Sequence, residues 1–176
     1  MSLDDELSDL LIISLEQAVA APYCGLLLAS AGARVIKVER PEGDFARSYD
    51  NSINGKSAIF AWLNRGKESI SLDLKNKTDK KIFKNMLKKA DVFLSNLTPG
   101  SLEKLELDYK QVKALNPKLI FCEITGYGNS KLAHSKKAYD FLIQAESGLC
   151  SVTGTEKYPS KVGISITDLS TGLTAY

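Results

Sequence analysis

The chain has 176 residues, of which 44% are hydrophobic, so it can form one globular domain with a sizeable core. Its 23 basic and 21 acidic side chains give a net charge of +2 and are mixed along the sequence, which argues against nucleic acid as a partner. The acidic, polar N-terminus does not read as a signal peptide, and no apolar run approaches the roughly 18 residues of a membrane span. We therefore expect a cytoplasmic protein without a membrane partner.

The first elements in chain order predict a strand, a helix and a second strand. Leu11–Leu15 is a short apolar run, typical of a strand that is buried on both faces of a parallel sheet. Apolar residues then recur at helical spacing from Pro22 to Ala31, and Gly32 ends that helix. Arg34–Glu39 follows as a strand. Such a βαβ unit of about 30 residues is the building block of a parallel α/β sheet.

The polar segment from Pro41 to Lys56 is predicted to be a long surface loop, a kind of segment that often carries function. After it, strands are predicted over 70–74, 92–94 and 119–124, and helices over 102–107, 109–115 and 79–89, the last with Thr78 as its N-cap. This alternation predicts an α/β fold, namely a Rossmann-like, doubly wound domain with a mainly parallel sheet and helices on both faces.

Asp168 is the carboxylate with the most suggestive position. After an expected helix over 139–147, the buried-looking run VGISIT leads into Asp168, and Ser170 to Gly172 follow at a predicted helix start. Backbone N–H groups of a first helical turn favour an ionised carboxylate and can hold it as a nucleophile. The alternative is that Asp168 only caps the helix, and local chemistry leaves both possibilities open.

Other familiar sites are missing from the sequence. There is no Walker A sequence, and SLEQAVAAPYCG stands where a GxGxxG would follow the first strand, so NAD and ATP are not indicated. Cys24, Cys122 and Cys150 fit neither a disulfide framework nor a metal site. His134, the single histidine, lies in a polar loop, so we expect neither a catalytic triad nor a metal centre.

A series of stretches covers nearly all of the chain from Leu11 onward: LEQAVAAPYC, GARVIKVERPEGDFAR, LNRGKESISLDLK, ADVFLSNLTPG, LNPKLIFCEITGYG, KAYDFLIQAESGLCSVTG and SITDLSTG. In their order and spacing they resemble successive blocks of family III (CaiB/BaiF-type) CoA-transferases. The resemblance implies that residues 1–176 are the N-terminal part of a large Rossmann-like domain. It also implies that a small domain and the C-terminal half lie outside this chain, and that two subunits interlock as a homodimer.

The resemblance further implies the site residues. The family's catalytic aspartate falls on Asp168, in SITDLSTG. The positions implied to bind CoA or acyl-CoA are Val19, Ala20, Arg40, Leu72, Asp73, Leu74, Lys75, Asn96, Leu97, Thr98, Lys104, Lys137, Ala138, Tyr139 and Asp140. The cations among them suit the CoA phosphates. Lys104 replaces the Arg of related formyl-CoA transferases, so a point charge stands where they have a bidentate donor.

The activity implied is transfer of CoA from an acyl-CoA, such as succinyl-CoA, to a small carboxylic acid through anhydride and thioester intermediates on Asp168. CoA is then a substrate, and no tightly bound cofactor is expected. EQAVAAP and RPEGDFARSYD resemble members that act on dicarboxylates such as succinate, itaconate, mesaconate or citramalate. The family's glycine-rich loop for the oxyanion lies in the C-terminal half, so residues 1–176 alone are expected to be inactive.

Two alternatives stay open. A racemase or epimerase of 2-methylacyl-CoA shares the fold but pairs a histidine with an aspartate, whereas Tyr139 stands directly before Asp140 here, and tyrosine is a poor base at neutral pH. The second alternative is a CoA-binding fragment without catalysis of its own.

Overall fold

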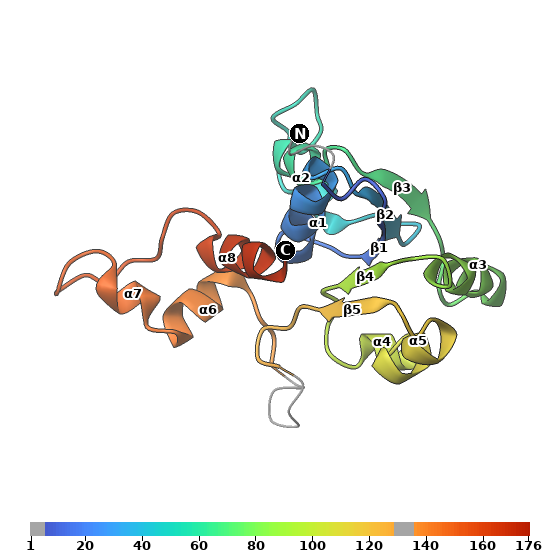
Figure 1. Ribbon diagram of the computed structural model, residues 1–176. Helices are drawn as coiled ribbons and strands as arrows, with labels where there is room; N and C mark the ends of the chain where they lie inside the picture. The colour runs from blue at the N-terminus through green and yellow to red at the C-terminus, as the bar shows by residue number, and fades with distance from the viewer. Residues whose placement is uncertain (1–5, 129–135) are drawn as a thin grey trace.

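The computed structural model describes residues 6–128 and 136–176 and confirms the α/β class (Figure 1). Five strands form one sheet in the order β3-β2-β1-β4-β5. They are β1 (Leu11–Leu15), β2 (Arg34–Glu39), β3 (Glu68–Ser71), β4 (Val92–Ser95) and β5 (Ile120–Glu123). Each neighbouring pair is parallel, so the carboxyl ends of the strands meet at one edge of the sheet.

Helices connect the strands and continue beyond them. They are α1 (Ala20–Ser30), the 3-10 helix η2 (Phe45–Ser48), α2 (Ala58–Leu63), α3 (Lys77–Leu87), α4 (Ser101–Lys104), α5 (Tyr109–Leu115), α6 (Asp140–Glu146), α7 (Leu149–Val152) and α8 (Ile166–Ala175). None of these described helices is long and apolar enough to cross a membrane.

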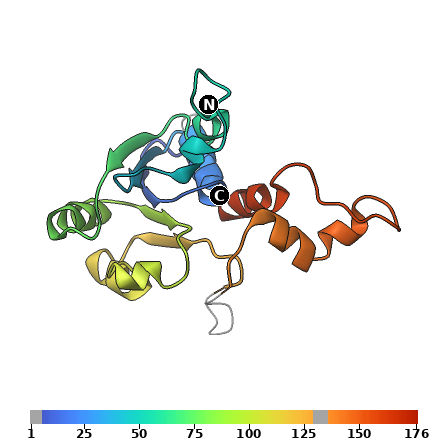
Figure 2. The same cartoon turned by 180° about the vertical axis from the view of Figure 1, so that it is seen from behind.

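The core has two layers, one on each face of the sheet. Successive residues of a strand point to opposite faces. Ile12 accordingly packs with Cys24 of α1, and the next residue, Ile13, packs with Phe83 and Leu87 of α3. Helices α1 and α8 lie on the first face, and α3, α4 and α5 cover the second (Figures 1 and 2). The doubly wound arrangement expected from the sequence is confirmed.

The predicted boundaries of β3 and α3 are wrong. The strand predicted over 70–74 spans Glu68–Ser71, because Leu72 and Leu74 are buried in the loop after the strand and not within it. Helix α3 starts two residues earlier than predicted, because the Asn76 side chain is the cap. Its Oδ1 accepts a hydrogen bond from the Thr78 N–H at 2.7 Å, so Thr78 is not the N-cap.

Helix α2, directly after the polar loop, is not predicted from the sequence. Ser57 caps it, and its hydroxyl accepts a hydrogen bond from the Phe60 N–H at 3.1 Å. Ser57 Oγ in turn donates to Asp50 Oδ2 at 2.8 Å. A helix of six residues is too short to give a clear periodic signal.

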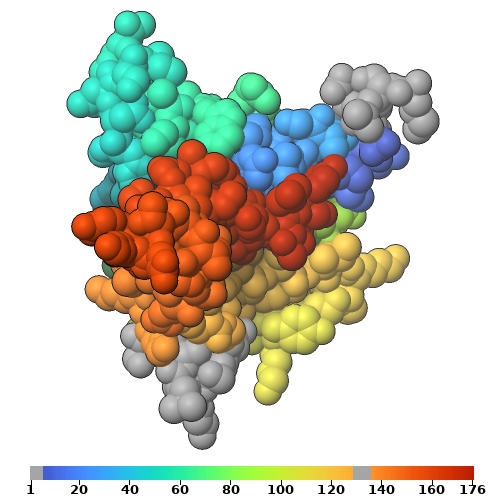
Figure 3. All heavy atoms as spheres, turned by 90° about the vertical axis from the view of Figure 1, so that its left-hand side faces the viewer, coloured from blue at the N-terminus to red at the C-terminus, as the bar shows by residue number. Residues whose placement is uncertain are grey.

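The C-terminal part differs more from expectation. The run before Asp168 is neither a strand nor buried, and Ile164 is 57% exposed. Helix α8 begins at Ile166 with Ser165 at its N-cap, so Asp168 lies within the first turn and is not the cap. The run before α8 follows α6 and α7, which stand out from the sheet, and of the three C-terminal helices only α8 packs extensively on α1 (Figures 2 and 3).

Candidate active site

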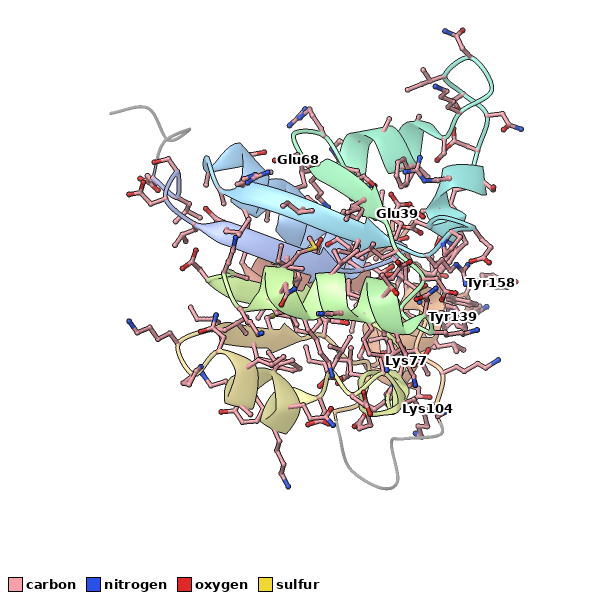
Figure 4. The ribbon with its side chains drawn as sticks, turned by 90° about the vertical axis from the view of Figure 1, so that its right-hand side faces the viewer. Glu39, Glu68, Lys77, Lys104, Tyr139 and Tyr158 are labelled. Atoms are coloured by element: carbon pink, nitrogen blue, oxygen red, sulfur yellow. The ribbon has the colours of Figure 1, made fainter. Side chains whose placement is uncertain are left out.

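The candidate site lies at the carboxyl edge of the sheet. In Figure 4, Glu39 marks this edge at the end of β2, and Glu68 marks the opposite edge at the start of β3. The chain order reverses at β1, which pairs with both β2 and β4, and ligands of open α/β sheets bind at such switch points.

A cavity of about 290 Å³ opens at this switch point, and we call it the Asp168 cavity. Its walls come from the loops after β1, β4 and β5, from η2, and from the segment that leads into α6. It brings together the predicted residues Val19, Ala20, Asn96, Leu97, Thr98, Lys137, Ala138, Tyr139, Asp140 and Asp168. Predicted residues up to 149 positions apart in the sequence, from Val19 to Asp168, therefore face one cavity.

A second cavity of about 200 Å³ lies beside the first, at the ends of β2 and β3, and we call it the Arg40 cavity. It gathers the predicted residues Arg40, Leu72, Asp73, Leu74 and Lys75. Gln17 and Leu97 line both cavities, so the two adjoin. An elongated ligand can lie across them, with one end near Asp168 and the other near Arg40.

Lys104 is the one predicted binding residue that lines neither cavity. It is the last residue of α4 and is exposed (Figure 4). Its direct neighbour Leu105 lines the Arg40 cavity.

The electrostatics of Asp168 suit a reactive carboxylate. Burial and, to a smaller extent, the nearby charge of Asp140 raise the pKa of Asp168 to about 6. Burial also acts on Asp140, but hydrogen bonds from Thr167 and Gln144 outweigh it and hold the pKa of Asp140 below its ordinary value. Asp140 is therefore the ionised partner, and Asp168 is a carboxylate of increased basicity.

The carboxylate of Asp140 accepts hydrogen bonds that fix the start of α8. Its Oδ1 accepts from the Thr167 N–H at 2.8 Å and from the Thr167 hydroxyl at 2.6 Å, and its Oδ2 accepts from Gln144 Nε2 at 2.6 Å. These bonds hold the residue directly before Asp168. The arrangement favours an anchoring role for the Asp140 side chain, with its backbone forming part of the cavity wall.

Arg40 is positioned for an anionic ligand. Its Nε donates to the Gly43 carbonyl at 3.0 Å, while its side chain is 59% exposed and lies 3.9 Å from Glu42. An exposed ion pair at this distance contributes little to stability, so the guanidinium is available to a phosphate.

Ten residues that line the Asp168 cavity are not predicted from the sequence, among them Gln17, Ala18, Phe45 and Tyr49. Gln17 and Ala18 lie two and three residues after Leu15, the last residue of β1. They could have been predicted, because ligands of open α/β sheets bind at the carboxyl ends of strands. Phe45 and Tyr49 are aromatic residues in an otherwise polar segment. Burial raises the pKa of Tyr49, and the charges of Asp44 and Asp168 raise it further.

In residues 6–128 and 136–176, no three His, Cys, Asp or Glu side chains gather as a metal site would require. His134, for which the sequence favours neither a catalytic triad nor a metal centre, lies outside the described residues.

The sequence profile of CoA-transferase family III matches residues 7–176. The chain belongs to CoA-transferase family III. This match confirms the resemblance inferred from the sequence blocks. The family is named for CoA transfer.

The relatives of this chain include CoA-transferases with small dicarboxylates in their names. The chain is 40% identical to the acetyl-CoA:oxalate CoA-transferase of Acetobacter aceti, over 93% of this chain and 43% of that protein. It is 38% identical to the succinate–glutarate CoA-transferase of Agrobacterium fabrum, over 95% of this chain and 44% of that protein. The crystal structure of a CAIB/BAIF family protein from Brucella suis has a TM-score of 0.92 and 36% identity, over 98% of this chain and 47% of that one. The chain thus spans less than half the length of these relatives.

Proposed function

We propose that this protein transfers CoA from an acyl-CoA to a carboxylic acid, with Asp168 as the nucleophile. The observation that carries the proposal is a half-buried carboxylate with a pKa raised to about 6, facing the Asp168 cavity at the switch point of the sheet. Membership in CoA-transferase family III and the adjoining Arg40 cavity support the same reading.

The chemistry needs only the carboxylate of Asp168 and the thioester. The carboxylate attacks the acyl carbonyl, the C–S bond breaks, and CoA leaves as a thiolate while a mixed anhydride forms. The thiolate then attacks the Asp168 carbonyl carbon and displaces the free acid, which leaves CoA bound to Asp168 as a thioester. An acceptor carboxylate repeats both steps in reverse. The raised pKa makes the carboxylate more basic while it is still mostly ionised at neutral pH.

The proposed acceptor is a small dicarboxylate, and the proposed donor is succinyl-CoA or a similar thioester. The relatives' names, with oxalate and glutarate, support this choice. The whole protein is proposed to include a small domain and to form an interlocked homodimer, with residues 1–176 as the N-terminal part of the large domain. Exposed apolar residues on the protruding helices, such as Phe141 and Val152, are consistent with cover from elsewhere in such an assembly.

The direct test is to incubate the purified whole protein with succinyl-CoA and glutarate and to follow glutaryl-CoA by mass spectrometry. Formation of glutaryl-CoA with release of succinate is expected. Exchange of the α-proton of a 2-methylacyl-CoA without transfer would support a racemase instead, and saturable CoA binding with neither reaction would support a binding module.

Replacing Arg40 with Ala should weaken CoA binding by about tenfold, because one charge-assisted contact to a phosphate is lost, and should change kcat much less. Isothermal titration with CoA at moderate salt gives the affinity. Arg34→Ala is the matched control, since Arg34 pairs with Glu68 at 2.7 Å at the opposite edge of the sheet. Equal CoA affinity of Arg40→Ala and the control would remove Arg40 from the site.

The transfer rate should fall in acid with an apparent pKa of about 6, well above the ordinary 3.8 of an aspartate. The sign follows from the mechanism, because attack needs the ionised carboxylate and a raised pKa moves its protonation toward neutral pH. Below this pKa, kcat/KM should drop about tenfold for each pH unit. Circular dichroism at each pH verifies that the protein is folded. A rate that is constant well below pH 6 would contradict the assignment.

A further inference from the structure

Lys37 and Asp44 form a buried ion pair, and Asp44 lines the Arg40 cavity, which adjoins the Asp168 cavity. Lys37 Nζ lies 2.6 Å from Asp44 Oδ2, and both side chains are 1% exposed. Lys37 also donates to Asn64 Oδ1 at 3.1 Å and lies 3.9 Å from Glu16. Buried ion pairs often add little to stability compared with apolar residues of the same size. Stability alone therefore does not account for this pair.

The second oxygen of Asp44 connects two walls of the cavity. Asp44 Oδ1 accepts from the Ala46 N–H at 2.9 Å, at the start of η2, and from the Ala18 N–H at 3.2 Å, in the turn after β1. The turn contributes Gln17 and Ala18 to the Asp168 cavity, and η2 contributes Phe45. Lys37 lies in β2, within the sheet. Its ion pair with Asp44 fixes the carboxylate that joins the turn after β1 to η2.

The backbone of the turn after β1 has an unfavourable conformation at Ala18, which needs stabilising contacts. Ala18 has a φ of +64°, in the left-handed region that costs an alanine free energy and favours glycine. On the other side of the turn, the Gln17 N–H donates to Asn96 Oδ1 at 2.9 Å, and Asn96 Nδ2 donates to the Gln17 carbonyl at 2.8 Å. A strained residue persists where surrounding contacts over-determine it, and such residues gather at functional sites.

We propose that Asp44, fixed by Lys37, is a positioning residue that holds Ala18 in the left-handed conformation and so keeps the turn after β1 in place along the Asp168 cavity. Asp44 acts through the turn and has no contact with the reacting atoms. The expected effect on rate rests on the proposed CoA transfer, whereas the effect on the turn does not.

The test uses the whole protein carrying Lys37→Met and Asp44→Ser together, which leaves no unpaired charge from this pair in the core. Serine can still cap Ala46, but its side chain is one bond shorter than that of Asp44, so its oxygen lies farther from the Ala18 N–H, which is already 3.2 Å from Asp44 Oδ1. Hydrogen exchange at the Ala18 amide should accelerate by about tenfold or more. Transfer from succinyl-CoA to glutarate should slow by about 10²-fold, because a displaced wall misplaces the bound substrate.

Adding Ala18→Gly to this double variant separates positioning from general damage. Glycine adopts a φ of +64° without strain. It should therefore restore about tenfold of the lost rate if Asp44 works through Ala18. A merely destabilised core would gain nothing from an added glycine. Full activity of the double variant, or no recovery with Ala18→Gly, would overturn the proposal.

If the double variant does not fold, Asp44→Asn replaces it, since the amide keeps the shape and an acceptor oxygen but loses the charge that Lys37 fixes. Faster exchange at Ala18 together with a slower rate is then expected, and unchanged values of both would overturn the proposal. If the wild-type protein shows no transfer, the proposed function fails, and the exchange at Ala18 still decides on Asp44.

Discussion

Replacing Asp168 with Asn should abolish CoA transfer by the whole protein, with a loss of about 10⁴-fold or more. The amide has nearly the same shape as the carboxylate but cannot form an anhydride with the acyl group, so covalent catalysis ends at its first step. Asp168 also lies in the first turn of α8, where a neutral amide is tolerated. The measurement is the initial rate of glutaryl-CoA formation from succinyl-CoA and glutarate.

A matched control for this variant is Asp91→Asn, at the opposite edge of the sheet. Asp91 Oδ2 accepts a hydrogen bond from the Leu11 N–H at 2.8 Å, and an amide oxygen can keep that bond. Both variants should retain the circular dichroism spectrum and a similar Tm, and only Asp168→Asn should lose transfer. Retention of more than a small share of the wild-type rate would show that Asp168 is not the nucleophile.

Replacing Gly172 with Ala should lower both transfer and stability, because this glycine of α8 packs directly against α1. A Cβ at Gly172 would lie 2.5 Å from the Ala20 backbone oxygen and 3.0 Å from Tyr23 Cδ1. A backbone oxygen cannot rotate away as a side chain can, so α8 has to move. Asp168 lies one helical turn before Gly172 and moves with the helix.

We expect the Gly172→Ala variant to lose about 10²-fold in transfer rate, and to lose about 1–3 kcal/mol in the free energy of unfolding. Gly163→Ala is the control, since a Cβ at Gly163 has nothing within 4 Å. Rate assays and urea unfolding of both variants measure the two effects. Wild-type behaviour of Gly172→Ala would mean that the packing of α8 on α1 does not set the position of Asp168.

The parts of the fold that could be predicted are those that local patterns determine. Leu11–Leu15 and Arg34–Glu39 are confirmed to the residue, because each is a short apolar or alternating run between polar turns. Two parallel strands and their crossover helix also predict the carboxyl edge of the sheet, where we propose that the ligand binds.

The parts that could not be predicted depend on contacts between distant segments. Nothing near Ala18 indicates a positive φ, because the support comes from Asp44 and Asn96, which are far away in the sequence. The start of α8 predicted from the sequence is wrong. Ile164 belongs to an apolar run that is typical of a buried segment, but it is exposed because it has no layer of the sheet to pack on. The hydrophobic periodicity of a segment indicates which of its residues are suited to burial. Whether those residues are buried depends on the tertiary structure around them.

The central claim, that CoA passes through a covalent bond to Asp168, is tested most directly by oxygen transfer from the acceptor. Glutarate labelled with ¹⁸O in its carboxylates is allowed to turn over with succinyl-CoA, and the peptide containing Asp168 is then analysed by mass spectrometry. Breakdown of the second anhydride leaves one acceptor oxygen on the aspartate, so Asp168 should carry one ¹⁸O atom per completed transfer until further turnover exchanges it. Glutaryl-CoA formed in good yield with an unlabelled Asp168 would contradict the account.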